Sequence, residues 1–197
     1  MSHVIYRSEG MVLGGTSFGE ANRYVTIFTR DFGMVTVRAQ GVRTVMSKFR
    51  LHLEDYAISH IGFVRGREFL RLTNALKICN VDANLADKPR ARRLSAQLLS
   101  LLKRLAPPEE SHTVLYDELR SLFEYFCTTA IPVAEMRTIE HIAVARMLHT
   151  FGYFSSDVPF ADLFSQEPMS PAMFACAQEM QKEIRNEINR SLRLTHL

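Results

Sequence analysis

The chain has 197 residues, 47% hydrophobic and 23% charged, with a formal net charge of +3, values ordinary for a globular chain that folds without metal or disulfide staples. Cys79, Cys127 and Cys176 are odd in number and about 50 residues apart, which argues against a disulfide framework or a CxxC metal site and favours the cytoplasm. There is no apolar run of about 18 residues and no signal-like N-terminus, so neither export nor membrane insertion is expected.

Short β-rich runs alternate with turn residues in the first part of the chain. Asp31 and Gly33 mark a tight turn between the second and third runs, and Gly66 marks one between the fourth and fifth. The expected strands are residues 4–13, 23–29, 34–39, 56–64 and 68–78. Five strands with a long irregular link between the third and fourth suggest a small closed barrel of the OB type.

The alternation of side chains predicts which strand residues are buried. Val35, Val37 and Ala39 on the third strand are expected to face the barrel interior. Tyr24 and Phe28 share one face of the second strand; both could stack on bases, but burial in the core is expected for both. The segment GGTSFG at residues 14–19 has the composition of a phosphate loop, but its place between two strands predicts a plain turn.

After residue 80 the apolar spacing becomes helical, and four amphipathic helices are predicted. Pro89 fits the first turn of the first helix, Gly152 ends the third, and Ser170 caps the fourth with Pro171 at its first position. The helices are expected to cover residues 89–105, 115–126, 133–151 and 170–192. The predicted fold class is α+β, all-β then all-α. An OB-fold barrel is expected at residues 1–80 and a helical domain at residues 81–197.

No catalytic constellation is found in the sequence. The chain lacks GxxxxGK[ST], GxSxG and HExxH. His141 and His149 have no carboxylate or cysteine at the spacing of a metal site, and Glu135 and Glu140 point in different directions on a helix. A non-enzymatic protein with no catalytic residue, cofactor or bound metal is therefore expected.

Positive charge is concentrated in the first part of the chain. Residues 1–80 carry 11 Lys+Arg against 6 Asp+Glu, whereas residues 81–197 carry 13 against 15. An OB barrel binds nucleic acid with the loops between strands 1 and 2 and between strands 4 and 5, and with the face of strands 2 and 3. The expected DNA-binding residues are Arg38, Arg43, Lys48, Arg50, Arg65, Arg67 and Arg71. The alternative is a solvated loop with scattered charges.

The segment GMVLGGTSFGEANRYVTIFTRDFGMVTVRAQGVRTVMSKFRLHLED, about 45 residues long, resembles the N-terminal OB domain of the RecO family of bacterial recombination-mediator proteins. The matching positions are Gly19, Glu20, Phe28, Thr29, Gly33, Ala39, Gly41, Arg43 and Ser47. Downstream, EHIAVARMLHTFGY looks like the family's third-helix segment, and EINRSLRL is similar to its last helix.

The resemblance implies a protein that binds single- and double-stranded DNA, anneals complementary strands and helps to load RecA together with RecR. It also implies a cytoplasmic, nucleoid-associated protein whose helical domain binds the acidic C-terminal tail of single-stranded-DNA-binding protein. The basic start of the first helix, Arg90, Arg92 and Arg93, is the expected contact for that tail. Many family members carry four cysteines after the Gly-Tyr, where this chain reads FSSDVPFADLF, so no structural zinc is expected.

Two other functions compete with this hypothesis. A protein-interaction adaptor would use the same barrel for partner proteins and would have no physiological DNA binding. A nuclease or ligase would need a metal or nucleotide site, and the sequence motifs for neither are present.

Overall fold

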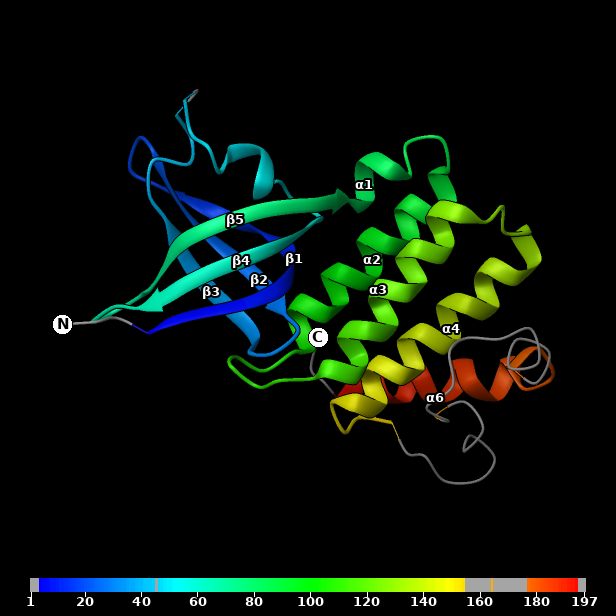
Figure 1. The fold of residues 1–197 in the computed structure, drawn as a ribbon. Helices are drawn as coiled ribbons and strands as arrows, with labels where there is room; N and C mark the ends of the chain where they lie inside the picture. The colour runs from blue at the N-terminus through cyan, green and yellow to red at the C-terminus, as the bar shows by residue number, and fades with distance from the viewer. Residues whose placement is uncertain (1–3, 45, 155–163, 165–176, 195–197) are drawn as a thin grey trace. The chain divides into compact units, whose positions relative to one another are not determined.

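The computed structural model describes residues 4–44, 46–154, 164 and 177–194 (Figure 1). The chain forms two compact units, residues 1–116 and 117–197. The first unit contains all five strands, and the second is helical in the residues that the structure describes. The predicted α+β class, strands followed by helices, is confirmed.

The five strands form a closed barrel (Figure 1). Around the barrel the order is β1-β2-β3-β5-β4, and every neighbouring pair is antiparallel except β3 and β5, which pair in parallel. This is the arrangement expected of an OB-type barrel. The strands are β1 (Ile5–Phe18), β2 (Asn22–Thr29), β3 (Gly33–Ala39), β4 (Ala57–Arg65) and β5 (Leu70–Asn80).

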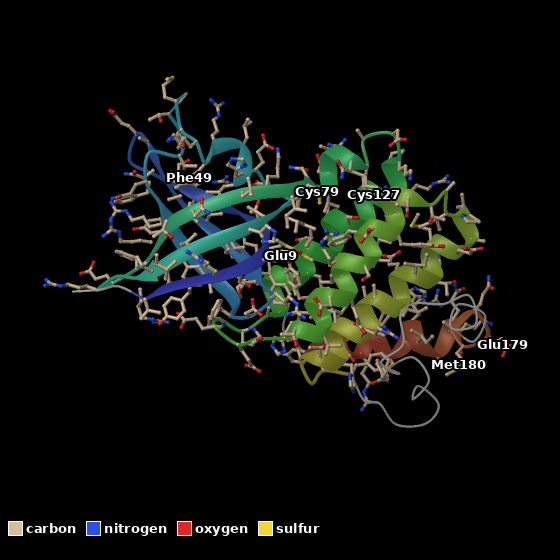
Figure 2. The ribbon with its side chains drawn as sticks, in the orientation of Figure 1. Glu9, Phe49, Cys79, Cys127, Glu179 and Met180 are labelled. Carbon is tan, nitrogen blue, oxygen red and sulfur yellow. The ribbon has the colours of Figure 1, made fainter. Side chains whose placement is uncertain are left out.

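The barrel interior is apolar and follows the alternation read from the sequence. Val35, Val37 and Ala39 of β3 are buried in one hydrophobic cluster, as predicted. The link between β3 and β4 contributes Leu53, which is 1% exposed, and contains the short 3-10 helix η1 (Arg50–His52). Phe49 of the same link packs against the cluster (Figure 2). The predicted irregular link is therefore anchored to the core on one side.

Strand β1 is longer than predicted, because the segment GGTSFG is not simply a turn. Residues 14–18 continue the strand, and the turn to β2 follows at residues 19–21. A register shift between Val12 and Gly15 bends the strand, and Gly14 has a φ of 106° that other residues rarely adopt. A side chain at Gly15 would collide with the carbonyl oxygen of Tyr24. Two glycines thus carry the strand through a bulge.

The segment after the first long helix completes the first unit. The short helix α1 (Val81–Asn84), which was not predicted, and α2 (Pro89–Leu105), which was, lead to residues 106–111. Pro108 forms a parallel bridge with Met34, and the backbone N–H of Glu109 donates to the Met34 carbonyl at 2.9 Å. The change from strand to helix falls at residue 80 as expected, but the first compact unit extends to residue 116.

Three helices follow in the described residues: α3 (Thr113–Thr128), α4 (Val133–Thr150) and α6 (Gln181–Leu194). They correspond to the second, third and fourth predicted helices, and Gly152 follows α4 with a φ of 77°. The predicted cap at Ser170 and Pro171 lies outside the described residues. Within the described residues, no helix combines the length and apolar character needed to cross a bilayer.

Candidate nucleic-acid interface

An aromatic cluster lies on the outer face of the barrel, where the β1–β2 turn, the β4–β5 turn and the β2–β3 face meet. Phe18 ends β1, Tyr24 lies on β2 and Phe69 immediately precedes β5. The Tyr24 ring centroid is 5.4 Å from that of Phe18 and 5.5 Å from that of Phe69, and both pairs are tilted by about 55°. Phe18 and Phe69 remain 46% and 44% exposed. We call these three residues the aromatic cluster.

Two arginines border the aromatic cluster. Arg38 is the β3 partner of Tyr24 and also pairs in register with Arg71 at the start of β5. The guanidinium carbon of Arg38 lies 5.3 Å from the centroid of the Phe18 ring, within cation–π range. Its Nε is buried and has no hydrogen-bond partner among the described residues. Arg71 is exposed.

The prediction that Tyr24 and Phe28 are both core residues is confirmed for Phe28 and wrong for Tyr24. Phe28 is 0% exposed, and its ring centroid lies 5.9 Å from that of Tyr116, at the start of α3. Tyr24 is only half-buried and contacts the two exposed rings. The two side chains share a strand face, but Tyr116 covers only one end of it. Phe18 and Phe69 were missed, because single aromatic residues beside glycine turns show no pattern.

The link between β3 and β4 lies beside the β1–β2 turn. The backbone N–H of Arg43 donates to the Ala21 carbonyl at 3.0 Å, and its guanidinium donates to the Gly19 carbonyl at 3.2 Å. Arg43 thus has a structural contact in addition to its exposed charge. Lys48 and Arg50 are exposed farther along the same link.

The carboxylates of this link are paired with cations from outside it. Asp55 accepts from Arg23 of β2 at 2.6 Å, and Glu54 accepts from Lys77 of β5 at 3.1 Å. Among the described residues, no carboxylate forms an ion pair with the three link cations predicted to bind DNA, Arg43, Lys48 and Arg50. Their charges are therefore available to an anionic ligand.

The three arginines at the β4–β5 turn differ in whether a carboxylate pairs with them. Arg65 ends β4 and donates to Glu109 at 2.7 Å, and this hydrogen bond raises the pKa of Arg65. Arg67 is exposed within the turn. Of the predicted cations at this turn, Arg65 is neutralised by a carboxylate from the segment after α2, whereas Arg67 and Arg71 have no ion pair with a described residue.

The basic start of α2 is also partly neutralised. Arg92 makes two hydrogen bonds to Asp82 of α1, and the pKa of that carboxyl is lowered by the contact. Arg90 and Arg93 are exposed. The predicted basic patch therefore presents two cations rather than three.

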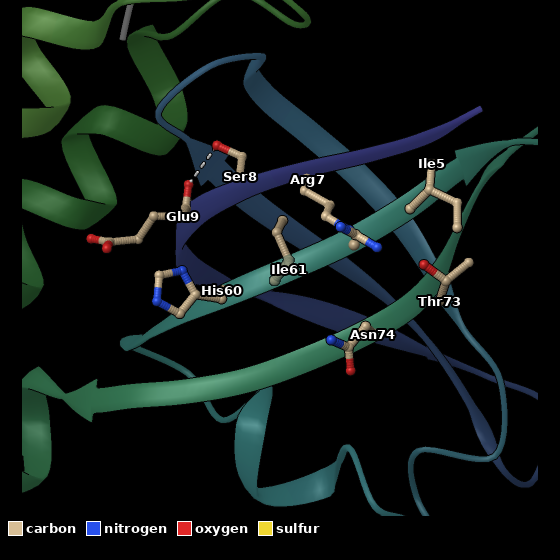
Figure 3. Close-up of a pocket in the computed structure, with 9 residues that line it drawn as sticks. Ile5, Arg7, Ser8, Glu9, His60, Ile61, Thr73 and Asn74 are labelled. Atoms are coloured by element: carbon tan, nitrogen blue, oxygen red, sulfur yellow. Dashed lines mark hydrogen bonds between the residues drawn. The ribbon is translucent and has the colours of Figure 1, made fainter.

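An open hollow lies on the outer face of β1, β4 and β5 (Figure 3). Its volume is about 550 Å³, and Gly62 is one of its lining residues, at a position where a side chain would press on Thr73 and Asn74. Arg7 and His60 bring polar groups to it (Figure 3). No Phe, Tyr or Trp lines it.

His141 and His149, which were considered as metal ligands, do not belong to a metal-binding cluster of described residues. His149 stacks on the ring of Phe164, with centroids 4.3 Å apart, and burial lowers the pKa of His141. Across the described part of the chain, no group of three or more His, Cys, Asp or Glu is placed to hold a metal ion. The segment FSSDVPFADLF, residues 154–164, contains no cysteine and lies largely outside the described residues. These residues do not fit a four-cysteine zinc site.

The residues that form the barrel match a known protein domain. Residues 1–79 match the family model described as the N-terminal domain of recombination protein O. Residues 1–79 are therefore similar to the N-terminal domain of RecO proteins. The matched residues cover all five strands except the last residue of β5.

Similar proteins include the DNA repair protein RecO of Rubrobacter xylanophilus, 32% identical over 120 residues. The DNA repair proteins RecO of two strains of Bifidobacterium longum are each 30% identical over 118 residues. In all three cases the alignment covers 60% of this chain and 48% of the relative. The chain therefore spans about half the length of these RecO proteins.

Proposed function

We propose that this chain is a member of the RecO family and a non-enzymatic DNA-binding protein of recombinational repair. It binds single- and double-stranded DNA, anneals complementary strands and assists the loading of RecA on cytoplasmic, nucleoid DNA. The OB surface consists of the β1–β2 turn, the β2–β3 face, the β3–β4 link and the β4–β5 turn. The observation that supports the proposal most strongly is the set of cations on this surface that have no ion pair with a described residue: Arg43, Lys48, Arg50, Arg67 and Arg71.

The physical basis is neutralisation of phosphates. Each Lys or Arg that contacts a phosphate releases condensed counterions, and such contacts carry no sequence information. Two complementary strands repel each other through their phosphates. A protein surface that neutralises them lowers this repulsion and lets base pairing select the correct partner. No covalent step is needed, so the proposal requires no catalytic group.

The test is the salt dependence of binding. We expect the affinity for a labelled single strand, measured by fluorescence anisotropy, to fall steeply as salt rises, with a log-log slope of about −0.7 per phosphate contacted. Unrelated sequences should give the same slope. In the same conditions the protein should accelerate the pairing of two complementary strands.

The competing function is an adaptor with no physiological DNA binding. It predicts a weak signal that changes little between low and moderate salt, and no acceleration of strand pairing. That result would remove the DNA-binding proposal. Cleavage of the strands on addition of magnesium would instead show that the non-enzymatic assignment is wrong.

The partners are proposed mainly from the family. We expect RecR to act with this protein, and the acidic tail of single-stranded-DNA-binding protein to contact the start of α2 through Arg90 and Arg93. The exposure of these two cations supports the second contact. Arg90→Ala together with Arg93→Ala should weaken binding of a tail peptide at low salt, whereas Arg92→Ala should do so less because Arg92 is paired with Asp82. Equal losses would contradict this assignment.

A further inference from the structure

The aromatic cluster is not explained by phosphate binding or by packing of the barrel. Its two outer rings, Phe18 and Phe69, are nearly half exposed and come from two turns that are far apart in the sequence. Tyr24 of β2 contacts both of these rings. Exposed phenylalanines at turns contribute little to the core, so their exposure points to a ligand with flat, apolar faces.

Arg38, which contacts the aromatic cluster, gives a second indication of a ligand. Its guanidinium is held over Phe18, and its Nε–H is buried without a hydrogen-bond partner among the described residues. A buried donor without an acceptor is unfavourable, and folding tolerates it when a ligand or an ordered water supplies the acceptor. The guanidinium is also planar, and such planes stack on nucleobases as aromatic rings do.

We propose that the aromatic cluster and Arg38 form a base-stacking site for unpaired nucleotides of single-stranded DNA. This rests on the proposed function, because it assigns a strand class to one part of the proposed DNA surface. Bases of a single strand stack on Phe18, Tyr24, Phe69 and the guanidinium plane of Arg38, while the charges of Arg38 and the neighbouring Arg71 attract its phosphates. Stacking of this kind tolerates any base, because every base has a π face.

The site selects single strands over duplex. In a duplex the base faces are covered by their neighbours, so the rings can reach them only after the pair is opened, which costs free energy. The cations of the link and of the β4–β5 turn bind phosphates of either form. The hollow on β1, β4 and β5 has polar groups but no Phe or Tyr, so it has no rings for base stacking.

The test compares two ligands of equal length and charge: an oligothymidylate, and a strand of the same sugar-phosphate units without bases. We expect the wild-type protein to bind the oligothymidylate at least about 10-fold more tightly, since each stacked base strengthens binding about 5-fold or more. Both ligands should show similar salt slopes, because their phosphates are the same.

Variants locate the site. Phe18→Ala and Phe69→Ala should each weaken oligothymidylate binding about 5-fold or more and leave binding of the base-free strand unchanged. Tyr24→Phe, which keeps the ring, should retain the preference for bases. The matched control is Leu76→Ala, which removes a side chain that is 56% exposed elsewhere on the barrel surface, and it should change neither affinity.

Each outcome decides between the two proposals. Equal, salt-dependent binding of the two ligands by the wild-type protein would overturn the stacking site and leave phosphate binding intact. Absence of binding to both would overturn the proposed function and the stacking site together. A preference for bases that survives both alanine changes would show that stacking occurs, but not at this cluster, and the assignment would be wrong.

Discussion

Arg38 of β3 lies over the ring of Phe18 at the end of β1, with 5.3 Å between the guanidinium carbon and the ring centroid. The contact joins a cation on the sheet face to an aromatic residue at the β1–β2 turn. Arg38 therefore provides both charge and a flat surface, and the two contributions can be separated by substitution.

Arg38→Lys keeps the charge but removes the planar guanidinium. We expect the affinity for single strands to fall about 2- to 5-fold, the range of an exposed cation–π contact, with the salt slope unchanged. Arg38→Ala should lower the affinity further and make the slope shallower by about 0.7. Anisotropy titrations at several salt concentrations check both variants. If Lys fully replaces Arg, the position contributes charge only.

The cations of the β3–β4 link should affect DNA binding and stability differently. Replacing Arg43, Lys48 and Arg50 together with Ala should make the salt slope shallower by up to about two units for single strands of any sequence and should slow annealing. Lys48→Ala with Arg50→Ala should change stability by no more than about 0.5 kcal/mol. Arg43→Ala should cost about 0.5–1.5 kcal/mol, because it removes the hydrogen bond to Gly19.

Salt-dependent binding and thermal melting of each variant check this division. The control for the Lys48 and Arg50 variant is Lys182→Ala with Arg185→Ala on α6, which also removes two charges, from exposed positions of the other unit. An unchanged slope in the triple variant would place the DNA contacts elsewhere, with Arg67 and Arg71 the first to examine. Early melting of the Lys48 and Arg50 variant would show that these side chains are structural.

Glu109 should limit the contribution of Arg65 to DNA binding. Glu109→Gln removes the carboxylate that pairs with Arg65 at 2.7 Å, so the freed cation should strengthen binding of single strands and steepen the slope by about 0.7. Stability should change little, because both side chains are exposed. Glu187→Gln, which removes the carboxylate that pairs with Arg190 on α6, is the matched control. Equal effects of the two substitutions would indicate a general charge effect.

Gly33 should be more sensitive to substitution than Gly41, although their φ angles are 65° and 64°. An Ala at either position costs about 1–2 kcal/mol for the left-handed backbone. At Gly33 the added Cβ would also lie 1.8 Å from the Glu110 carbonyl oxygen, whereas nothing lies within 4 Å at Gly41. Urea unfolding should therefore show a clearly larger loss for Gly33→Ala. Equal losses would mean that residues 106–111 do not pack on β3 as described.

His141 should make the stability of the helical unit depend on pH. Burial lowers its pKa below the ordinary 6.5, Glu140 opposes the decrease, and Arg137 and Arg185 add to it. Between pH 6.5 and the lower folded pKa, the unfolded chain binds a proton that the folded chain does not. Stability is thus highest above pH 6.5 and falls as the pH drops through that range. His141→Gln should lose this part of the dependence.

Two measurements check the His141 prediction. An NMR titration of the imidazole should give a midpoint below 6.5, and unfolding curves at pH 7.5 and 5.5 should differ less for His141→Gln than for the wild type. A midpoint at or above 6.5 would contradict the effect of burial.

Local sequence patterns predicted much of the barrel. They did not predict which side chains on its outer face are exposed and which are covered by residues far along the chain. The alternation of Val35, Val37 and Ala39 predicted their burial, because period-two spacing reports directly on a strand face. The same spacing could not separate Tyr24 from Phe28, since the difference arises from Tyr116, far along the chain. The Arg65–Glu109 pair was hidden for the same reason: its partners are 44 residues apart.

The location of bound DNA tests the central claim most directly. We expect ¹H–¹⁵N NMR spectra recorded during titration with an oligothymidylate to show the largest shifts at the β1–β2 turn, the β2–β3 face and the β4–β5 turn, including Phe18, Tyr24, Arg38, Phe69 and Arg71. Shifts confined to the hollow around Arg7 and His60, or to residues 117–197, would contradict the claim that the OB surface with the aromatic cluster binds single-stranded DNA.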